Sequence, residues 1–352
     1  MLFDGLGRNP STLQMGFASA PPILQYGMLA RRSLVANLLA VAATVVAVTS
    51  VAAQAYPTRP IKMIVPYPPA GPIDTMARLL GQQLSQRFGQ QVVIDNRPGA
   101  GSMLGTKAAA AADPDGYTLL FGSSGSLAVS PALYANYDLD IRKVFVPVGS
   151  VALLPHVLVI NPTVPAHSVG ELIAYAKANP GKLNYGASIG TPPHLLSTLF
   201  ATKTGIDVVY VPYKGSAASV TDLVSGETQF TIDGLTGLYP LIEAGKVRAL
   251  AIARAERWRE LSDLPTLVES GFPDFTVDAW TGVMAPAGTP ASIVGTLNRA
   301  INEGLASAEA RAGLARFSAI AQTGSPQEFG ALVASEIPKW AAIVKLSGAR
   351  IE

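Results

Sequence analysis

The sequence of 352 residues has no cysteine, only three histidines, and few charged side chains, which make up 14% of the chain. The absence of cysteine excludes disulfides, thiol nucleophiles and cysteine-ligated metals. His156, His167 and His194 are scattered, and no H-x-x-x-H pair or acidic cluster joins them. We therefore expect neither a bound metal nor a cofactor.

Positive and negative charges are nearly balanced, with 26 Lys and Arg against 24 Asp and Glu. Residues 1–55 contribute three arginines and one aspartate to these totals, so 23 basic and 23 acidic residues remain. A neutral body without a basic run has no electrostatic footprint for nucleic acid. We therefore expect no nucleic-acid partner.

Residues 28–55 contain the three parts of a secretory signal peptide in the usual order. Met28–Arg32 is short and positive, Leu34–Val51 is almost wholly apolar, and Ala53-Gln54-Ala55 fits a cleavage site before Tyr56. This order predicts export to the periplasm and removal of the segment. The alternative is a membrane anchor, because the apolar run approaches the roughly 18–20 residues that span a bilayer.

Residues 1–27 show no periodicity, and we expect them to be disordered or untranslated, with Met28 as the start. The following 297 residues suffice for two domains of about 150 residues each. The strand-like runs are Ile61–Val65, Val92–Ile94, Thr118–Phe121, Val157–Ile160, Val208–Val211 and Ala249–Ala253. The helical runs are Thr75–Phe88, Val169–Ala178, His194–Thr204, Ser219–Ser225 and Pro290–Leu305. Such alternation predicts an α/β fold with mostly parallel sheets.

No Pro/Gly-rich linker separates two halves of this region. Two lobes without a linker are best explained by a chain that crosses between them twice. We place the crossings at Leu153–Ile160 and Val277–Ala287, where extended segments end in Asn161-Pro162 and Ala285-Pro286.

A strand that turns sharply into a helix is the most informative local pattern. Ile61–Val65 reads as a buried strand and a helix begins near Asp74. The loop between them contains Pro69, Ala70 and Gly71. Because the first N–H groups of a helix lack intrahelical partners, such a turn can bind an anion. The design recurs at Ser188–His194 and Lys214–Ser216, which predicts a cleft that binds a small anionic molecule.

Six blocks of sequence, in order between Tyr56 and Glu352, resemble one family. They are YPTRPIKMIVPYPPAGPID, NRPGAGSMLG, PDGYTLLFGSSGS, VPYKGSAASVTDLVSG, GKVRALAIA and LPTLVESG. The chain resembles the Bug, or tripartite tricarboxylate transporter, periplasmic solute-binding proteins. The resemblance implies a two-lobed, type II periplasmic-binding fold with two mixed, mostly parallel sheets joined by two crossover segments. It supports a lobe 1 made of 56–155 plus 281–352 and a lobe 2 made of 156–280.

The resemblance also implies a function. A monomeric receptor would capture a small carboxylate, such as a dicarboxylate, an acidic amino acid or an aromatic acid, in a closing cleft. It would deliver this ligand to the membrane subunits of a tripartite tricarboxylate-type transporter. A ligand sensor that feeds a two-component kinase needs the same cleft and stays an alternative. Family members usually have two glycines at Ala70-Gly71 and often a polar residue at Gly234, so no known ligand can be transferred.

Two serines and two aromatic residues are candidates for contact with a ligand. Ser123 and Ser124 follow a strand, where small hydroxyls can donate into a cleft. The alternative is a turn that uses Ser and Gly for their backbone preferences. Tyr67 in the first loop and Trp280 in the second crossing could wall the pocket or fill the core.

The segment Gly186–His194 matches the G-x-S-x-G pattern of a hydrolase nucleophile at Ser188. A serine hydrolase is therefore an alternative function. However, the fold that carries this pattern places its histidine far downstream, and only His194 follows Ser188, six residues on. Thr191 instead reads as an N-cap with Pro192 as the first helical residue. Backbone donors to an anion would come from Ser188, Gly190, Thr191 and His194, and the His194 ring would contact ligand or support the loop.

Charged side chains near the expected cleft are few. Lys214, beside Gly215, is the only cation in the candidate loops and could pair with a carboxylate or be solvated, while Ser216 reads as an N-cap. Asp74 lies in the first turn of a helix, where a carboxylate is usually a cap or dipole partner. Asp233, at the end of a strand over Gln229–Ile232, could accept a hydrogen bond from an amino or hydroxyl group of the ligand.

Overall fold

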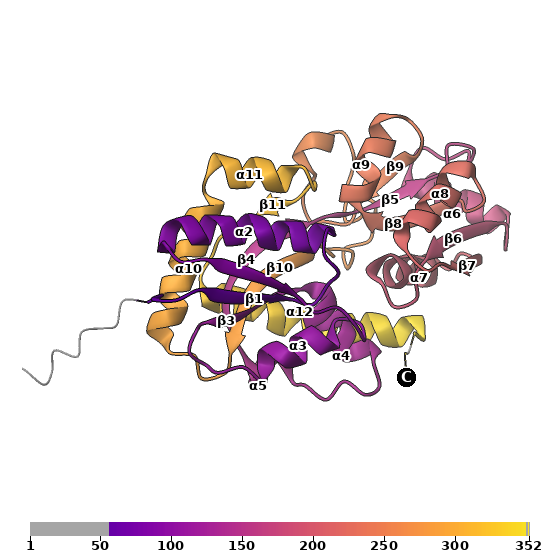
Figure 1. Ribbon diagram of the computed structural model, residues 1–352. Helices are drawn as coiled ribbons and strands as arrows, with labels where there is room; N and C mark the ends of the chain where they lie inside the picture. Colours follow the sequence, from indigo (N-terminus) through magenta and orange to yellow (C-terminus); the bar gives the residue numbers. More distant parts are fainter. Residues whose placement is uncertain (1–55, 350, 352) are drawn as a thin grey trace, which may run out of the picture. The chain divides into compact units, whose positions relative to one another are not determined.

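Two β-sheets organise the protein into two lobes (Figure 1). The computed structural model describes residues 56–349 and 351, and from Tyr56 onward the chain forms one unit. The predicted signal peptide at 28–55 and the segment 1–27 lie outside the described residues. The predicted two-lobed α/β fold with two mixed sheets is confirmed. The sheets are not mostly parallel as predicted, because β10 and β5 each run antiparallel to both of their neighbours.

Lobe 1 is built around a six-stranded sheet with the order β11-β4-β10-β3-β1-β2. Its strands are β1 (Ile61–Val65), β2 (Val92–Asn96), β3 (Thr118–Ser123), β4 (Phe145–Leu154), β10 (Ala279–Pro286) and β11 (Ile320–Ala321). Its helices are α2 (Pro72–Phe88), α3 (Met103–Ala110), the π-helix η1 (Gly125–Val129), α4 (Ser130–Leu133), α5 (Ile141–Val144), α10 (Ala291–Leu305), α11 (Ala308–Ala315) and α12 (Pro326–Ser347). β10 runs antiparallel to β3 and β4 and lies between them, so it holds the centre of the sheet.

Lobe 2 is built around a five-stranded sheet with the order β7-β6-β8-β5-β9. Its strands are β5 (His156–Ile160), β6 (Leu183–Ala187), β7 (Val208–Pro212), β8 (Phe230–Gly234) and β9 (Arg248–Ile252). Its helices are α6 (Val169–Ala178), α7 (Pro192–Thr204), α8 (Ser216–Ser225), α9 (Leu235–Glu243) and the 3-10 turn η2 (Arg259–Leu261). β5 runs antiparallel to both of its neighbours, β8 and β9.

Buried strands with apolar side chains on both faces hold each sheet between helices. In β1, Ile61, Met63 and Val65 belong to the core under α2 and α10, while Ile64 belongs to the core on the opposite face. Because successive side chains of a strand point to opposite faces, the apolar residues of β1, which only the exposed Lys62 interrupts, suit a sheet covered on both sides.

The helix starts that were predicted to follow strands differ by a few residues. α2 begins at Pro72 and α7 at Pro192, with Gly71 and Thr191 as their N-caps. Proline is well tolerated in the first turn because the N–H that it lacks would have no helical partner there. The N-cap prediction for Thr191 is confirmed, but that for Ser216 is wrong. Gly215 takes the cap position of α8, and Ser216 is the first helical residue.

The chain passes from one sheet to the other at two places within the predicted crossings. β4 ends at Leu154 and β5 begins at His156, so Pro155 alone separates strands of different sheets. The return leads into β10, which begins at Ala279. The predicted lobe boundary between residues 280 and 281 thus falls inside a strand of lobe 1. The full division into lobes by residue number stays a prediction.

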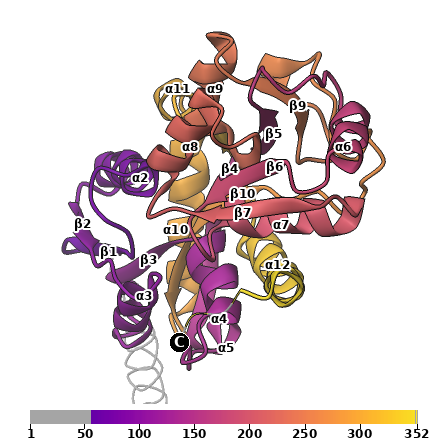
Figure 2. The same ribbon diagram turned by 90° about the vertical axis from the view of Figure 1, so that its right-hand side faces the viewer.

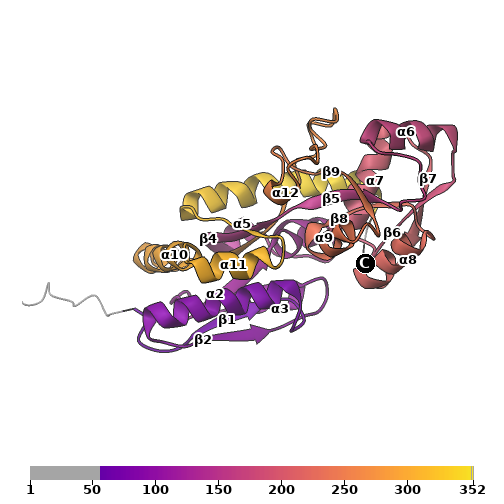
Figure 3. The ribbon, with the colours of Figure 1, turned by 90° about the horizontal axis from the view of Figure 1, so that it is seen from above.

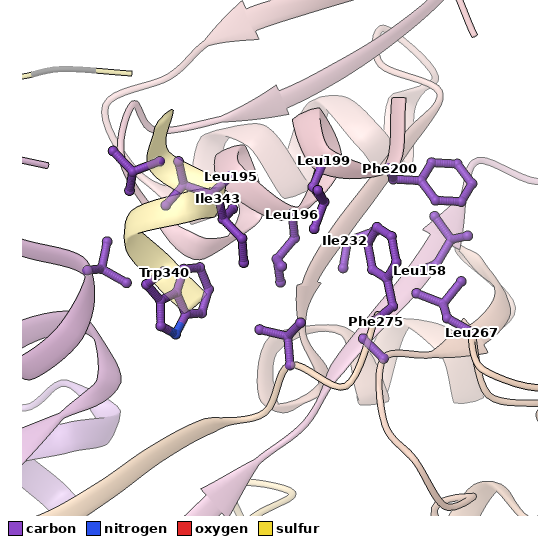
Figure 4. Packing of buried hydrophobic residues seen from close by; sticks show 14 of the residues in the cluster. Leu158, Leu195, Leu196, Leu199, Phe200, Ile232, Leu267, Phe275, Trp340 and Ile343 are labelled. Atoms are coloured by element: carbon purple, nitrogen blue, oxygen red, sulfur yellow. The ribbon is translucent and has the colours of Figure 1, made fainter. Parts of the chain in front are cut away.

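Helix α12, which the sequence patterns did not reveal, contacts both lobes. It begins with a capping box between Ser325 and Glu328 and packs on β4 and η1 of lobe 1. Its later turns pack on α7 of lobe 2 (Figures 2 and 3). Figure 4 shows Trp340 and Ile343 of α12 facing the leucines of α7. One hydrophobic core therefore extends from lobe 1 into lobe 2.

No helix among residues 56–349 combines the length and the apolar character needed to cross a bilayer.

Candidate functional site

Two chambers lie next to each other where the lobes meet. Leu154 and Ala279, which are paired in the β4–β10 ladder, line both of them. We call the first the hydroxyl chamber; its volume is about 320 Å³. We call the second the Asp233 chamber; its volume is about 310 Å³. Each is large enough for part or all of a small organic acid.

The hydroxyl chamber takes its name from its polar wall. The hydroxyl-bearing residues are Tyr67, Ser102, Ser123, Ser124, Ser130, Tyr134 and Thr191. They come from both lobes, since Thr191 is the N-cap of α7 and the others belong to lobe 1. The apolar wall contains Ile73, Val129, Leu133, Leu154, Ile189, Trp280 and Ile351. None of the described residues that line this chamber carries a charged side chain.

Most of the hydroxyl groups in this chamber already donate a hydrogen bond to another group of the protein. Ser130 donates to the carbonyl of Gly101 at 2.6 Å, and Thr191 donates to the carbonyl of Ser188 at 2.7 Å. Ser124 differs, because its hydroxyl has no hydrogen-bond partner among the described residues although the residue is only 2% exposed. An unpartnered polar group in a cavity is available to a ligand.

A second available proton comes from a pair of hydroxyls on neighbouring loops. Tyr67 Oη lies 2.6 Å from Ser123 Oγ, and either oxygen can donate to the other. Burial raises the pKa of Tyr67, although hydrogen bonds from neighbouring serines oppose this effect. The phenol therefore keeps its proton at neutral pH. One hydroxyl of the pair donates to the other, and the remaining proton can turn toward the chamber.

The Asp233 chamber has a different polar character. Its lining includes Pro72 of α2, His156 of β5, Ser216 of α8, and Asp233 and Thr236 beside the start of α9. Burial raises the pKa of Asp233 to about 6, while the Gly234 N–H, 2.6 Å from Oδ1, opposes the rise. Asp233 has no ion pair with any described residue. It is thus a carboxylate without a countercharge.

Six of the predicted site residues meet at the hydroxyl chamber: Tyr67, Ser123, Ser124, Gly190, Thr191 and Trp280. Asp233 lines the neighbouring chamber. Trp280 is 1% exposed and contributes to both the pocket wall and the core, so the two interpretations of this residue are compatible. These six residues come from three separate loops and from β10, whereas the predicted loop at Lys214–Ser216 contributes nothing to the hydroxyl chamber.

Asp74, by contrast, lines neither chamber, and its carboxylate is fully used within the protein. One oxygen accepts from the Ala70 N–H at 2.8 Å and from Arg78 Nε at 2.9 Å. The other accepts from Asn96 Nδ2 at 2.9 Å. Although burial acts to raise the pKa of Asp74, these bonds lower it. The geometry favours the structural interpretation, in which Asp74 fixes the first loop.

His194 also acts within its own loop. Its Nδ1 accepts from the Gly190 N–H at 3.2 Å, and its ring packs on Tyr210 with 4.4 Å between centroids. Burial lowers the pKa of His194, so the ring is neutral and Nδ1 can accept. The Gly190 amide is thereby occupied and is not one of the predicted anion donors. The geometry favours loop support for the His194 ring.

The remaining predicted residues lie outside both chambers. Pro69, Ala70 and Lys214 are exposed, and Gly71 and Gly215 are the N-caps of α2 and α8. Ser188 lies under its loop, and its buried hydroxyl has no partner among the described residues. No hydrogen bond joins Ser188 to His194, so a nucleophile–base pair is not formed there. The described residues hold no group of three or more acidic or histidine side chains suited to a metal ion.

The sequence itself matches a known family over most of its length. Residues 76–349 match the sequence profile of the family described as tripartite tricarboxylate transporter family receptor. The chain belongs to this family. This receptor is similar to BugT of Bordetella pertussis, with 39% identity over 322 residues that cover 90% of this chain and 99% of BugT.

Solved structures agree with the assignment of the receptor to this family. R. palustris Rpa4515 with adipate is 38% identical, has a TM-score of 0.73, and covers 84% of this chain and 100% of its own. MatC of Rhodopseudomonas palustris with bound malate is 32% identical, has a TM-score of 0.69, and covers 82% of this chain and 100% of its own. The periplasmic binding protein BugD is 33% identical, has a TM-score of 0.70, and covers 84% of this chain and 100% of its own. The receptor is thus a solute-binding protein with the two-lobed fold.

Sequence reasoning missed several residues that line the chambers of the receptor. Ser102 lies in NRPGAGSMLG, one of the blocks that carry the family resemblance, so it could have been proposed. His156 lies within the first predicted crossing, Leu153–Ile160, which was also a usable signal. Ser130 and Leu133 have no local pattern that marks them. Ile351 reaches the hydroxyl chamber because its backbone pairs with Leu133 and Ala135, at 3.1 and 3.0 Å.

Proposed function

We propose that the receptor binds a small carboxylate between its lobes, with the carboxylate group in the hydroxyl chamber. The observation that carries this proposal is the hydroxyl of the buried Ser124, which has no partner among the described residues and lies beside the Tyr67–Ser123 pair in the chamber wall. A hydrogen bond to a charged group contributes about 1.5–3 kcal/mol. Two such donors supply a large part of the roughly 8 kcal/mol that micromolar binding requires, so no cation is needed in the wall.

The apolar wall of the hydroxyl chamber determines which chemical groups the rest of the ligand can carry. Trp280, Leu133 and Ile189 suit an aliphatic or aromatic body, so dicarboxylates, acidic amino acids and aromatic acids are the classes to examine. The adipate of Rpa4515 and the malate of MatC, both small carboxylates, support this choice.

Closure of the two lobes over the ligand would present it to a membrane partner. We propose that the receptor, as a monomer, delivers its ligand to the membrane subunits of a tripartite tricarboxylate-type transporter, which the family assignment supports. A role in reporting the ligand to a sensor kinase would use the same closed form. A gene deletion separates the two, because loss of uptake of the bound carboxylate is expected only for the transport role.

Export is part of the same proposal. The receptor would be secreted to the periplasm and cleaved before Tyr56, because Ala53-Gln54-Ala55 fits a cleavage site. N-terminal sequencing of periplasmic material should therefore begin at Tyr56. Stable retention in the membrane fraction would contradict cleavage.

The hydrolase alternative rests on Ser188 alone. Its hydroxyl has no partner among the described residues, and Nδ1 of His194 is occupied by the Gly190 N–H. A nucleophile needs a base within hydrogen-bond reach. Turnover of generic esters that disappears in Ser188→Ala would nevertheless favour the hydrolase over the receptor.

Thermal-shift measurements with a panel of small carboxylates test the proposal, because a ligand that binds only the native state raises the melting temperature. For the carboxylate with the largest shift, Ser124→Ala should weaken binding by at least about tenfold. Ser292→Ala, at an exposed serine of α10, is the matched control and should bind normally. A panel without any shift, or equal affinity in Ser124→Ala, would contradict the proposed site.

A further inference from the structure

Two hydrogen-bond acceptors, Oδ2 of Asp233 and Nε2 of His156, belong to residues that line the Asp233 chamber and have no donor among residues 56–349 and 351. Asp233 Oδ1 accepts from the Gly234 N–H, and Oδ2 has no partner among the described residues. His156 is only 3% exposed and lines the same chamber. His156 directly follows Pro155, where the chain passes between the lobes, and Asp233, which is half-buried, pairs with Val157 of the same strand ladder.

The tautomer of His156 follows from its one hydrogen bond. Nδ1 lies 2.8 Å from the carbonyl oxygen of Val277, which can only accept, so Nδ1 carries the proton. Burial lowers the pKa of His156 to about 4, although the bond to Val277 opposes this effect. The ring is therefore neutral at physiological pH. Its Nε2 presents a lone pair and has no partner among the described residues.

No described lysine or arginine lines this chamber to balance the Asp233 carboxylate. The donors on the wall are few, because Thr236 gives its hydroxyl proton to the carbonyl of Phe317 in lobe 1. The Ser216 amide at the first residue of the ten-residue helix α8 can face a carboxylate. The chamber thus combines acceptors that need a donor with one helix start that suits an anion.

We propose that the Asp233 chamber binds an ammonium or hydroxyl substituent of the ligand through Asp233 and His156. The receptor then selects amino- or hydroxy-substituted carboxylates over the unsubstituted acids. This inference rests on the proposed carboxylate-binding function. It adds His156 to the site and assigns a role to the charge of Asp233. Leaving the two acceptors without a donor would disfavour the unsubstituted acid, because unpaired buried polar groups are costly.

Matched sets of probes test the selection. Succinate, malate and aspartate share one skeleton and differ only in the hydrogen, hydroxyl or ammonium at carbon 2. The set of 3-phenylpropionate, phenyllactate and phenylalanine does the same with an apolar body. In calorimetry, a substituted member of at least one set should bind at least about tenfold more tightly than its unsubstituted parent.

Variants identify the residues responsible. Asp233→Asn should reduce this preference to less than about threefold. His156→Asn keeps an N–H for the Val277 carbonyl but removes the second acceptor, and it should reduce the preference as well. Asp113→Asn, at an exposed residue of lobe 1, is the control and should keep the full preference.

The outcomes separate this inference from the proposed function. If no carboxylate of either set binds to the folded receptor, the proposed function fails and this inference fails with it. If the unsubstituted acids bind as tightly as the substituted ones, only the inference is overturned. An unchanged preference in both Asp233→Asn and His156→Asn also overturns it.

Discussion

The indole nitrogen of Trp340 lies 3.0 Å from Glu336 Oε2, one turn earlier in α12, and both residues are buried. The same oxygen accepts from the indole N–H of Trp280 at 3.4 Å. Lys339 Nζ lies 2.8 Å from Oε1 and 2.6 Å from the carbonyl of Thr276. Because Trp280 lines the hydroxyl chamber, Glu336 joins the helix that contacts both lobes to the wall of the site.

Replacement of Glu336 should therefore be costly. Glu336→Ala would leave two buried indole N–H groups unpaired and Lys339 without its countercharge. Loss of one partner in such a buried network costs about 2 to 4 kcal/mol of unfolding free energy. Urea denaturation measures the change, and Glu256→Ala, at an exposed residue of lobe 2, should stay within about 0.5 kcal/mol of wild type. A loss below about 1 kcal/mol would show that the network contributes little.

Gly190 and Leu133 come from different lobes and meet at the hydroxyl chamber. Gly190 has a φ of +74°, and a Cβ there would lie 2.2 Å from Leu133 Cδ2. Gly190→Ala should therefore strain the backbone and also push Leu133 aside, which weakens binding of a carboxylate ligand by at least about tenfold. Calorimetry with the carboxylate that gives the largest thermal shift measures this loss.

Gly205 offers a matched control for the backbone effect. Its φ is +64°, and a Cβ there would meet nothing within 4 Å. Gly205→Ala should cost about 1 kcal/mol of stability, as expected for an alanine in the left-handed region, but leave the affinity unchanged. Equal affinities in the two variants would argue against a role for the Gly190–Leu133 contact in binding.

The Asp233 carboxyl should give the ligand-free receptor a measurable pH dependence. Its pKa is raised to about 6, so the protonated form favours folding. This stability is present below about pH 4 and is lost as the pH rises through about 6. Asp233→Asn cannot ionise, so the variant should gain up to about 2 kcal/mol relative to wild type between pH 4.5 and pH 7.

Urea denaturation at the two pH values tests this expectation. His156 has its pKa lowered to about 4, so it favours the opposite trend, with stability lost as the pH falls from about 6.5. Its contribution cancels in the comparison, because both proteins contain it. Asp113→Asn should show no change in its difference from wild type. A relative gain for Asp233→Asn on the acid side would contradict the raised pKa.

The sequence patterns predicted the local units better than the long-range ones. β1, α6 and the strand–turn–helix units at Thr191 and Gly215 depend on nearby residues, and each was found within a few residues. The sequence reading did not mark Met103–Ala110, Leu235–Glu243 or Pro326–Ser347 as helices. Ser325 and Glu328 do form a capping box, which the sequence could have revealed, but the contact of α12 with α7 depends on tertiary packing.

In the candidate site, too, local features could be predicted from the sequence and long-range contacts could not. Ser124 and Tyr67 follow β3 and β1, two strands that pair in parallel, and such positions can be proposed from pattern alone. Asp74 has a suitable position in the sequence, but its carboxylate accepts hydrogen bonds from Ala70, Arg78 and Asn96. Only the three-dimensional arrangement reveals these bonds. Ile351 reaches the hydroxyl chamber through pairing with a segment more than 200 residues earlier, so no local pattern predicts it.

The charge of Lys214 should contribute little to binding. Lys214 is exposed and lines neither chamber, whereas Ser124 is buried in the chamber wall and its hydroxyl has no partner in the described part of the chain. A solvated cation outside the chamber gains little free energy from a carboxylate inside it, because water and salt screen the interaction. Lys214→Ala should therefore change the Kd of the carboxylate with the largest thermal shift by less than about tenfold, or roughly 1.4 kcal/mol.

Titration calorimetry of Lys214→Ala and Ser124→Ala at low and at physiological salt decides between a charged and a neutral anchor. The neutral anchor predicts that Ser124→Ala loses more affinity than Lys214→Ala at both salt concentrations. It also predicts a shallow salt dependence in wild type, because hydrogen bonds from buried hydroxyls are screened much less than exposed charges. If Lys214→Ala abolishes binding while Ser124→Ala retains it, the carboxylate is held by the lysine and the hydroxyl chamber is not its site.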